Sequence, residues 1–250
     1  MKKPLISIVI TYYRKKQFID KTINSILNQT YKNYEIIFVY DDEDHRDIEF
    51  IKNILIKVKK KKLIINKKNL GVAKSRNIAV SKSRGLYLAF IDSDDIWNRY
   101  KLDKQLKFMK KKLVSFSFTS YSIINEQDKI LKTRRVFFDA TYSDLLKSNF
   151  IGLNTVMINR KILPDIYFPN LKTQEDYALW LKLARKGHKL KHFNQVLSSW
   201  RDTKNSLSSN IFYKIRDAFK LYYIYEKKNF ILSIYSVLIL SYKKIIKNFY

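Results

Sequence analysis

The first half of the chain alternates short apolar runs with segments of helical periodicity. The apolar runs are partly β-branched, as is typical of buried strands, and they lie at residues 5–12, 34–40, 63–65 and 86–91. Between them, apolar residues recur at helical spacing in segments 18–27, 48–58 and 72–83. This β-α-β-α-β-α-β order predicts an α/β fold with right-handed crossovers, a mostly parallel sheet and helices on both faces.

The pattern changes after residue 97. We expect a basic helix at 100–111, an antiparallel strand pair at 114–124 and 130–138, a short helix at 142–147, strands at 155–158 and 196–200, and between these two strands a helix that starts at 174–176. Gly187 closes that last helix as a C-terminal cap. The second half is therefore mixed in its strand directions.

Carboxylates follow two of the predicted parallel strands. Asp41 and Asp42 come after the second strand, and Asp92, Asp94 and Asp95 come after the fourth. Carboxyl ends of parallel strands meet at one sheet edge, where α/β folds bind ligands. Crowded carboxylates repel one another and call for a cation, and Mg²⁺ or Mn²⁺ with a phosphate-bearing ligand fits. The alternative is an acidic turn in which Asp95 is the N-cap of the next helix.

Glu175 and Asp176 begin a predicted helix and have two interpretations. Acids near a helix N-terminus interact favourably with the macrodipole. A carboxylate there can also act as a general base toward an attacking hydroxyl. Spacing alone does not connect this pair to Asp94.

Composition narrows the functional classes. A chain of 250 residues with 46% hydrophobic residues is long enough for one large domain, or one domain with an appendage. The absence of cysteine excludes disulfides and thiolate metal sites. No G-x-G-x-x-G or P-loop motif is present. The N-terminus lacks signal-peptide features, and no segment has the about 20 apolar residues of a spanning helix.

The net charge of +28 suggests a polyanionic partner. However, 39 lysines outnumber 11 arginines and are spread along the chain. Arginine is the residue favoured for bidentate phosphate recognition. A nucleic-acid-binding protein would need clustered arginine or a recognised motif, so we expect no nucleic-acid partner.

The last forty residues, 211–250, interleave aromatic and basic side chains. Their apolar stretch at 230–240 is too short to span a bilayer. A basic, aromatic, amphipathic helix pair suits an anionic membrane surface. Alternatively, these helices pack against the rest of the chain or against a second subunit in a homo-oligomer.

Six stretches in order resemble glycosyltransferase family 2, whose enzymes have the GT-A fold and use nucleotide-sugar donors. The resemblance spans residues 4–210. Asn69-Leu70-Gly71 with Arg76-Asn77 matches N-x-G-x-x-x-x-R-N, and residues 85–97 match G-x-Y-I-x-F-L-D-x-D-D-x-W, which contains the D-x-D metal motif. The remaining matches are residues 5–14, residues 35–41, Glu175-Asp176 with Leu179-Trp180, and Trp200-Arg201 with Asn205-Ser206-Leu207-Ser208.

The resemblance implies a role for each matching residue. Asp94, with Asp92, binds Mn²⁺ or Mg²⁺, and Asp176 is the catalytic base, with Glu175 as the second candidate. The expected donor-binding residues are Thr11, Tyr13, Asp41, Asp42, Arg76, Asp92, Ser93 and Arg201. It also implies a GT-A domain at 1–210, divided into a nucleotide-sugar half at 1–97 and an acceptor half at 98–210, with a helical appendage at 211–250.

Three positions depart from the family pattern. Tyr40 replaces the first acid of a D-D pair, so either Asp41 or Asp42 reads the base; Arg14 replaces an asparagine, and Thr203 replaces a histidine. The expectation is an inverting glycosyltransferase that uses a UDP- or dTDP-linked sugar and a glycan or lipid-linked acceptor in bacterial surface polysaccharide synthesis. We expect it in the cytoplasm, peripheral on the inner face of the membrane. The alternatives are an inactive membrane-associated scaffold of the same fold and a polyanion-binding protein.

Overall fold

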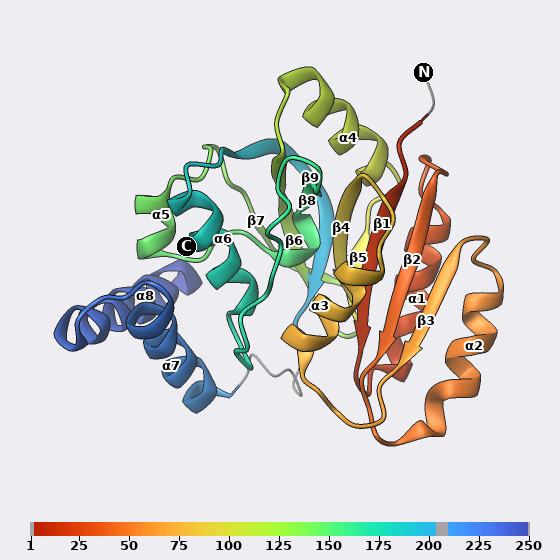
Figure 1. Cartoon of the computed structure of the whole chain (residues 1–250), viewed down its shortest axis with the longest axis horizontal. Helices are drawn as coiled ribbons and strands as arrows, with labels where there is room; N and C mark the ends of the chain where they lie inside the picture. Colours follow the sequence, from red (N-terminus) through yellow and green to blue (C-terminus); the bar gives the residue numbers. More distant parts are fainter. Residues whose placement is uncertain (1–2, 204–209, 250) are drawn as a thin grey trace.

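Nine strands form one sheet in the computed structural model, which describes residues 3–203 and 210–249 (Figure 1). Within these residues the strand order is β3-β2-β1-β4-β8-β6-β9-β5, and β7 pairs with β6. The β1–β2, β1–β4, β2–β3 and β6–β9 pairs are parallel, whereas β8, β5 and β7 pair antiparallel with their neighbours. The α/β expectation with a mostly parallel sheet is confirmed.

The first half has the predicted alternating order. Its strands are β1 (Ile6–Tyr12), β2 (Tyr34–Tyr40), β3 (Lys61–Ile65) and β4 (Tyr87–Asp92). Its helices are α1 (Lys16–Leu27), α2 (Ile48–Ile56) and α3 (Val72–Lys82), with a 3₁₀ turn η1 (His45–Asp47) before α2. Gly85 permits β4 to start beside β1, because a Cβ there would lie 2.5 Å from the Ser7 nitrogen.

The second half follows the strand β4. Its elements are β5 (Ile96–Trp97), α4 (Lys101–Lys112), β6 (Phe116–Ile124), β7 (Ile130–Arg134), α5 (Tyr142–Lys147), η2 (Leu153–Thr155), β8 (Met157–Asn159), α6 (Glu175–Arg185) and β9 (Leu190–Arg201). Gly187 has a φ of +81° just after α6, in agreement with the predicted cap.

Three details of the second half differ from the prediction. The strand predicted at 130–138 ends at Arg134. Strand β9 starts at Leu190 rather than at 196, because its first residues are half-exposed and mostly polar and hide the apolar pattern of a strand. Strand β5 was not predicted, since two residues are too few to show a periodicity.

Two hydrophobic clusters fill the two faces of the sheet. Helices α1, α2 and α4 contribute to one cluster, and α3 and α6 contribute to the other. On the α6 side, the buried ring of Trp180 packs edge-on against Phe116 with ring centroids 5.0 Å apart. Helix α6 is therefore fixed against the sheet by its apolar side, which leaves its N-terminal acids at the sheet edge.

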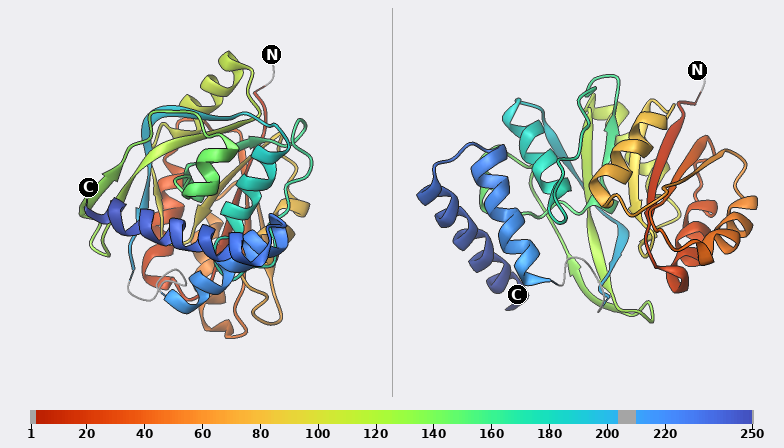
Figure 2. Two further views of the ribbon diagram at one scale, coloured as in Figure 1. Left: turned by 90° about the vertical axis from the view of Figure 1, so that its left-hand side faces the viewer. Right: turned by 60° about the horizontal axis from the view of Figure 1, so that its bottom comes forward.

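The C-terminal segment forms α7 (Ile211–Lys220), a π-helical turn η4 (Leu221–Tyr225) and α8 (Phe230–Phe249). These elements make a layer outside α5 and α6 (Figure 2). Tyr222 anchors the layer, since its hydroxyl donates to the Leu146 carbonyl at 2.9 Å and lies 3.2 Å from the Tyr177 hydroxyl. In the part of the chain that the structure describes, no helix has both the length and the apolar character that a membrane crossing requires.

Candidate active site

A single arginine connects the two acidic stretches singled out in the sequence. Arg76, on α3, is 4% exposed, and one of its terminal nitrogens lies 2.7 Å from Oδ1 of Asp92 at the end of β4. Its other terminal nitrogen donates to Oε1 of Glu175 at the start of α6. The D-x-D stretch and the Glu175-Asp176 pair therefore share one site, although 99 residues separate Arg76 from Glu175 along the chain.

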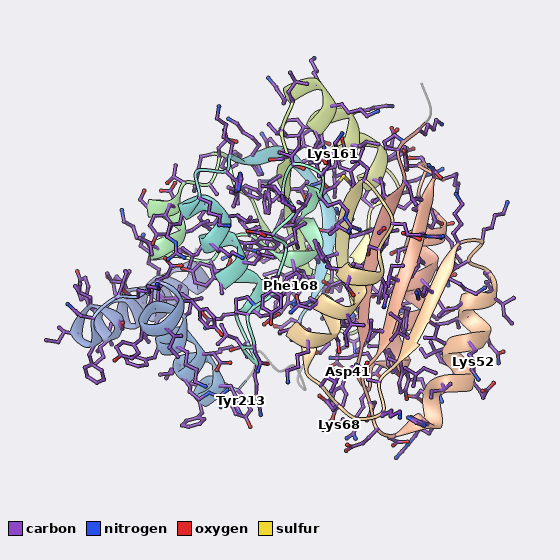
Figure 3. The ribbon with its side chains drawn as sticks, in the orientation of Figure 1. Asp41, Lys52, Lys68, Lys161, Phe168 and Tyr213 are labelled. Carbon is purple, nitrogen blue, oxygen red and sulfur yellow. The ribbon has the colours of Figure 1, made fainter. Side chains whose placement is uncertain are left out.

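The loop before α3 sets the position of Arg76. Asp41 follows β2, and its carboxylate accepts hydrogen bonds from the Leu70 and Gly71 amides at 2.8 and 3.0 Å and from the Asn66 side chain at 2.8 Å. Gly71 has a φ of +87°, which glycine adopts without strain. Asp41 thus organises the N-terminus of α3, near the lower edge of the sheet in Figure 3. Its role in reading the base stays a prediction.

Burial strongly perturbs the two carboxylates at the start of α6. Burial raises the pKa of Glu175 to about 7, against the opposing charge of Arg76. Burial likewise raises the pKa of Asp176 to about 6. The Asp176 carboxylate accepts the Tyr177 amide at 2.7 Å and is half-exposed, whereas Glu175 is buried against Arg76. Asp176 is therefore the more exposed of the two, and its role as the base stays a prediction.

Asp94 is paired with a lysine that the sequence did not single out. The Lys15 ammonium lies 2.9 Å from Oδ2 of Asp94 and donates to the Thr203 hydroxyl at 2.8 Å. Burial raises the pKa of Asp94, and the nearby Lys15 charge opposes that shift. Lys15 lies between β1 and α1, so it reaches Asp94 from the neighbouring strand.

Asp95 and Ser93 are buried beneath the site. Asp95 accepts hydrogen bonds from the Asn154 side chain at 2.7 Å and from the Arg201 amide at 2.9 Å. Burial and the charges of Asp94 and Asp92 raise the pKa of its carboxyl well above the usual range. The alternative in which Asp95 is the N-cap of the next helix is wrong, because Tyr100 occupies the N-cap position of α4 and Asp95 instead ties β5 to β9.

Arg201, at the end of β9, is almost completely buried. Its Nε donates to the Asp94 carbonyl at 2.8 Å, one terminal nitrogen donates to the Asn125 carbonyl at 2.7 Å, and the other lies 2.5 Å from Oδ1 of Asp128. Arg201 thus fixes the turn that carries Asp94 against the β6–β7 hairpin. Its predicted contact with the diphosphate stays a prediction, and the Asn205–Ser208 part of its motif lies outside the described residues.

The expected nucleoside pocket lies at the ends of β1 and β2. Thr11 pairs with Asp92 across the β1–β4 ladder and is half-buried. Tyr13 is 39% exposed just beyond the strand. Asp42 is buried and pairs with Arg14 at 2.9 Å. Thr11 and Tyr13 therefore lie at the same edge of the sheet as Asp92. Their contacts with the donor stay predictions.

The D-x-D carboxylates can accept a divalent cation together with a diphosphate. Among the described residues there is no cluster of three or more acidic, histidine or cysteine side chains of metal-binding geometry. Mg²⁺ and similar ions need only one or two carboxylates when substrate phosphates and water complete the shell. The side chains of Asp92 and Asp94 are 34% and 14% exposed at a strand end. They fit a cation that arrives with a nucleotide.

Three further residues at the site were missed in the sequence. Lys15 is one of 39 lysines, so composition hides it. Phe168 lies under the Arg76 guanidinium at 5.6 Å and is labelled in Figure 3. Tyr121, on β6, has a pKa raised by burial and by the charges of Asp176 and Asp95. The segments around Phe168 and Tyr121 carry no readable motif, so only the fold brings them to the carboxylates.

Comparison with known proteins shows the family of the chain. The family model described as Glycosyl transferase family 2 matches residues 7–167. The Escherichia coli UDP-Glc:α-D-GlcNAc-diphosphoundecaprenol β-1,3-glucosyltransferase WfaP is 38% identical over 213 residues, which cover 83% of this chain and 81% of WfaP.

Two solved structures share the fold. Staphylococcus aureus TarS 1–349 in complex with UDP-GlcNAc gives a TM-score of 0.70 at 18% identity, over 88% of this chain and 65% of that one. Mannosyltransferase PcManGT from Pyrobaculum calidifontis, with GDP-Man and Mn²⁺, gives 0.67 at 14% identity, over 91% of this chain and 66% of that one. The sheet and its acidic edge define a GT-A protein. The chain belongs to glycosyltransferase family 2.

Proposed function

We propose that this glycosyltransferase moves a sugar from a UDP- or dTDP-linked donor to a hydroxyl of a lipid-linked glycan, with inversion at the anomeric carbon. The bridge from Asp92 through Arg76 to Glu175 supports the proposal, because it places an acid of the D-x-D motif beside the residue that precedes the proposed base Asp176. The relative WfaP is named as a UDP-Glc-dependent transferase to a diphosphoundecaprenol-linked sugar, which supports the donor and acceptor classes.

The residues of the site suit a single displacement. Asp176 takes the proton of the acceptor hydroxyl as its oxygen attacks the anomeric carbon. The new carbon–oxygen bond forms on the face opposite the breaking bond to the β-phosphate, and the nucleoside diphosphate leaves with the electron pair. A single in-line displacement inverts the configuration. A Mn²⁺ or Mg²⁺ ion held by Asp92 and Asp94 would supply positive charge for the leaving diphosphate. The Mn²⁺ in the PcManGT complex supports this proposed use of a metal ion.

The test uses the full chain with a panel of UDP-, dTDP-, GDP- and CMP-linked compounds, with and without Mn²⁺. A ligand that binds only the native state raises the Tm. We expect a metal-dependent shift with UDP or dTDP compounds, and transfer to a GlcNAc-diphosphate lipid with inversion seen by NMR. A retained anomeric configuration, or transfer that is unchanged in Asp94→Asn, would contradict the proposal.

A catalytically inactive scaffold of the same fold is the second candidate. One observation favours it, since cations of the protein pair with both D-x-D carboxylates, Arg76 with Asp92 and Lys15 with Asp94. The same measurements separate the two candidates. A scaffold would show no metal-dependent nucleotide shift and no transfer with any donor.

A further inference from the structure

Helix α8 exposes a stripe of apolar side chains, although Val237 on its inner side is buried in the core. Ser233 and Ser236 also face inward, with 0% and 5% exposure, and their hydroxyls donate to the carbonyls of Asn229, just before the helix, and Leu232 at 2.8 and 2.7 Å. Ile231, Tyr235 and Leu238 face outward with 78%, 61% and 61% exposure. Their spacing of four and three residues places them on one stripe of the helix. An exposed apolar stripe of this kind indicates a partner.

The apolar surface continues from α8 onto α7. Phe212 and Ile215 of α7 are 70% and 51% exposed. At the turn between the helices, the ring of Phe219 stacks on Tyr223 at 5.4 Å and meets Phe230 edge-on at 5.5 Å. We call this surface the C-terminal face and define it by Phe212, Ile215, Tyr223, Ile231, Tyr235 and Leu238. Figure 2 shows α7 and α8 side by side at one end of the molecule.

The exposed charges around the C-terminal face are positive. The segment 210–243 contains two acids, and both are buried. Asp217 accepts the Thr173 amide at 2.9 Å, and Glu226 accepts the Tyr142 hydroxyl at 2.5 Å. In contrast, Lys220 and Lys227 are exposed. An apolar surface bordered by lysines is complementary to a surface that is apolar inside and anionic outside.

We propose that the C-terminal face docks on a bilayer surface that contains anionic lipids. The Ile and Leu side chains enter the boundary between headgroups and acyl chains, the tyrosines lie at headgroup level, and the lysines contact lipid phosphates. A second copy of this chain suits the face less well, because pairing two such faces would bring lysines together. The described helices do not meet the requirement for crossing the bilayer, so the contact is a surface contact.

Helix α7, which carries part of the C-terminal face, is hydrogen-bonded to the residues just before α6. Asp217 of α7 accepts hydrogen bonds from the backbone amide and the hydroxyl of Thr173 at 2.9 and 3.2 Å, and the Gln174 side-chain Nε2 donates to the Lys214 carbonyl at 3.0 Å. Thr173 and Gln174 immediately precede Glu175. Bilayer docking therefore holds the start of α6 at a defined orientation to the lipid surface. The use of this orientation for a lipid-linked acceptor rests on the proposed function, whereas the docking itself does not.

The test is sedimentation of the full chain with vesicles of phosphatidylcholine, with and without phosphatidylglycerol. We expect the protein to bind the anionic vesicles and salt to weaken this binding. Each of the substitutions Lys220→Gln and Lys227→Gln should lower the vesicle affinity by about fivefold. The double variant Ile231→Glu/Leu238→Glu should lose at least roughly tenfold in vesicle affinity. The matched control Ile56→Glu/Ile162→Glu changes residues that are 70% and 56% exposed elsewhere, and it should bind as the wild type does.

Two results would overturn the inference. One is equal vesicle binding by the Ile231/Leu238 variant and its control. The other is a wild type that does not bind vesicles and is a dimer in analytical ultracentrifugation, while the Ile231/Leu238 variant is a monomer. That result would assign the face to a second copy of the chain. Nucleotide-induced Tm shifts without vesicles report the site separately. If the Ile231/Leu238 variant keeps these Tm shifts but no longer binds vesicles, the result supports docking, whether or not the proposed reaction holds.

Discussion

The ammonium nitrogen of Lys15 lies 2.9 Å from the Oδ2 atom of Asp94. Asp94 is the residue to which the family motif assigns the metal. The Lys15 ammonium already places a positive charge of the protein beside that carboxylate. Lys15 also contacts Thr203, at the position where the family pattern often has a histidine. A lysine in this place would compete with the proposed metal ion for the same carboxylate oxygen.

Replacing Lys15 by methionine should tighten Mn²⁺ binding in the presence of UDP, by roughly tenfold, because the competing ammonium is removed. Titration of free Mn²⁺ by electron paramagnetic resonance measures this affinity. The control is Lys16→Met, since Lys16 is the next residue and pairs with Asp47 instead, at 3.2 Å. Weaker Mn²⁺ binding in Lys15→Met would show that the ammonium orients Asp94 rather than competing for it.

Replacing Arg76 by methionine should destabilise the fold by about 3–5 kcal/mol, because two carboxylates lose a buried partner. Without the arginine, the pKa of Glu175 rises further above its unfolded value. A carboxyl whose pKa is raised in the folded state contributes less to the stability of the fold as the pH rises through that folded pKa. The difference in unfolding free energy between the variant and the wild type should therefore widen above about pH 7. Urea denaturation at several pH values measures the free energy of unfolding.

Arg46 provides a matched substitution for that experiment, because its ion pair with Asp44 is at the surface and its side chain is 78% exposed. Arg46→Met should leave the unfolding free energy nearly unchanged, since exposed pairs contribute little. If Arg76→Met and Arg46→Met lower the free energy of unfolding by similar amounts, Arg76 contributes no more to stability than an exposed arginine does.

Replacing Asp176 by asparagine should lower sugar transfer at least about 100-fold, the usual range for a lost general base. Glu175→Gln should lower it less, because Glu175 is paired with Arg76 rather than open to an acceptor. Both variants should retain the Tm shift with UDP and Mn²⁺. A larger loss of transfer in Glu175→Gln, with the nucleotide shift intact, would exchange the two roles.

The rate of transfer should rise with pH and then level off. Burial raises the pKa of Asp176 to about 6 and that of Glu175 to about 7, and a general base must be deprotonated to act. The two groups are neighbours, so kcat/KM for the acceptor reports the pair and should climb between about pH 5 and about pH 7. A flat profile over that interval would exclude a carboxylate of this pair as the base.

The fold was largely predictable, because the apolar runs before Thr11, Asp41 and Asp92 mark successive parallel strands. The motifs also located the acids of the site on the correct elements. Which side chains pair could not be predicted, since register and rotamer decide it. Asp95, for which a helix cap was the alternative interpretation, is a buried tie between β5 and β9, and Lys15 could not be distinguished among the other lysines.

The proposed docking of the C-terminal face, held to the start of α6 through α7, would have a kinetic consequence. An enzyme held on a bilayer by the C-terminal face meets a lipid-linked acceptor by lateral diffusion in two dimensions, whereas the nucleotide sugar arrives from the bulk solution. Its turnover should then follow the mole fraction of acceptor in the membrane rather than the total acceptor concentration. Diluting the acceptor with inert lipid at constant total acceptor would therefore slow the wild type and leave a variant without the face unaffected.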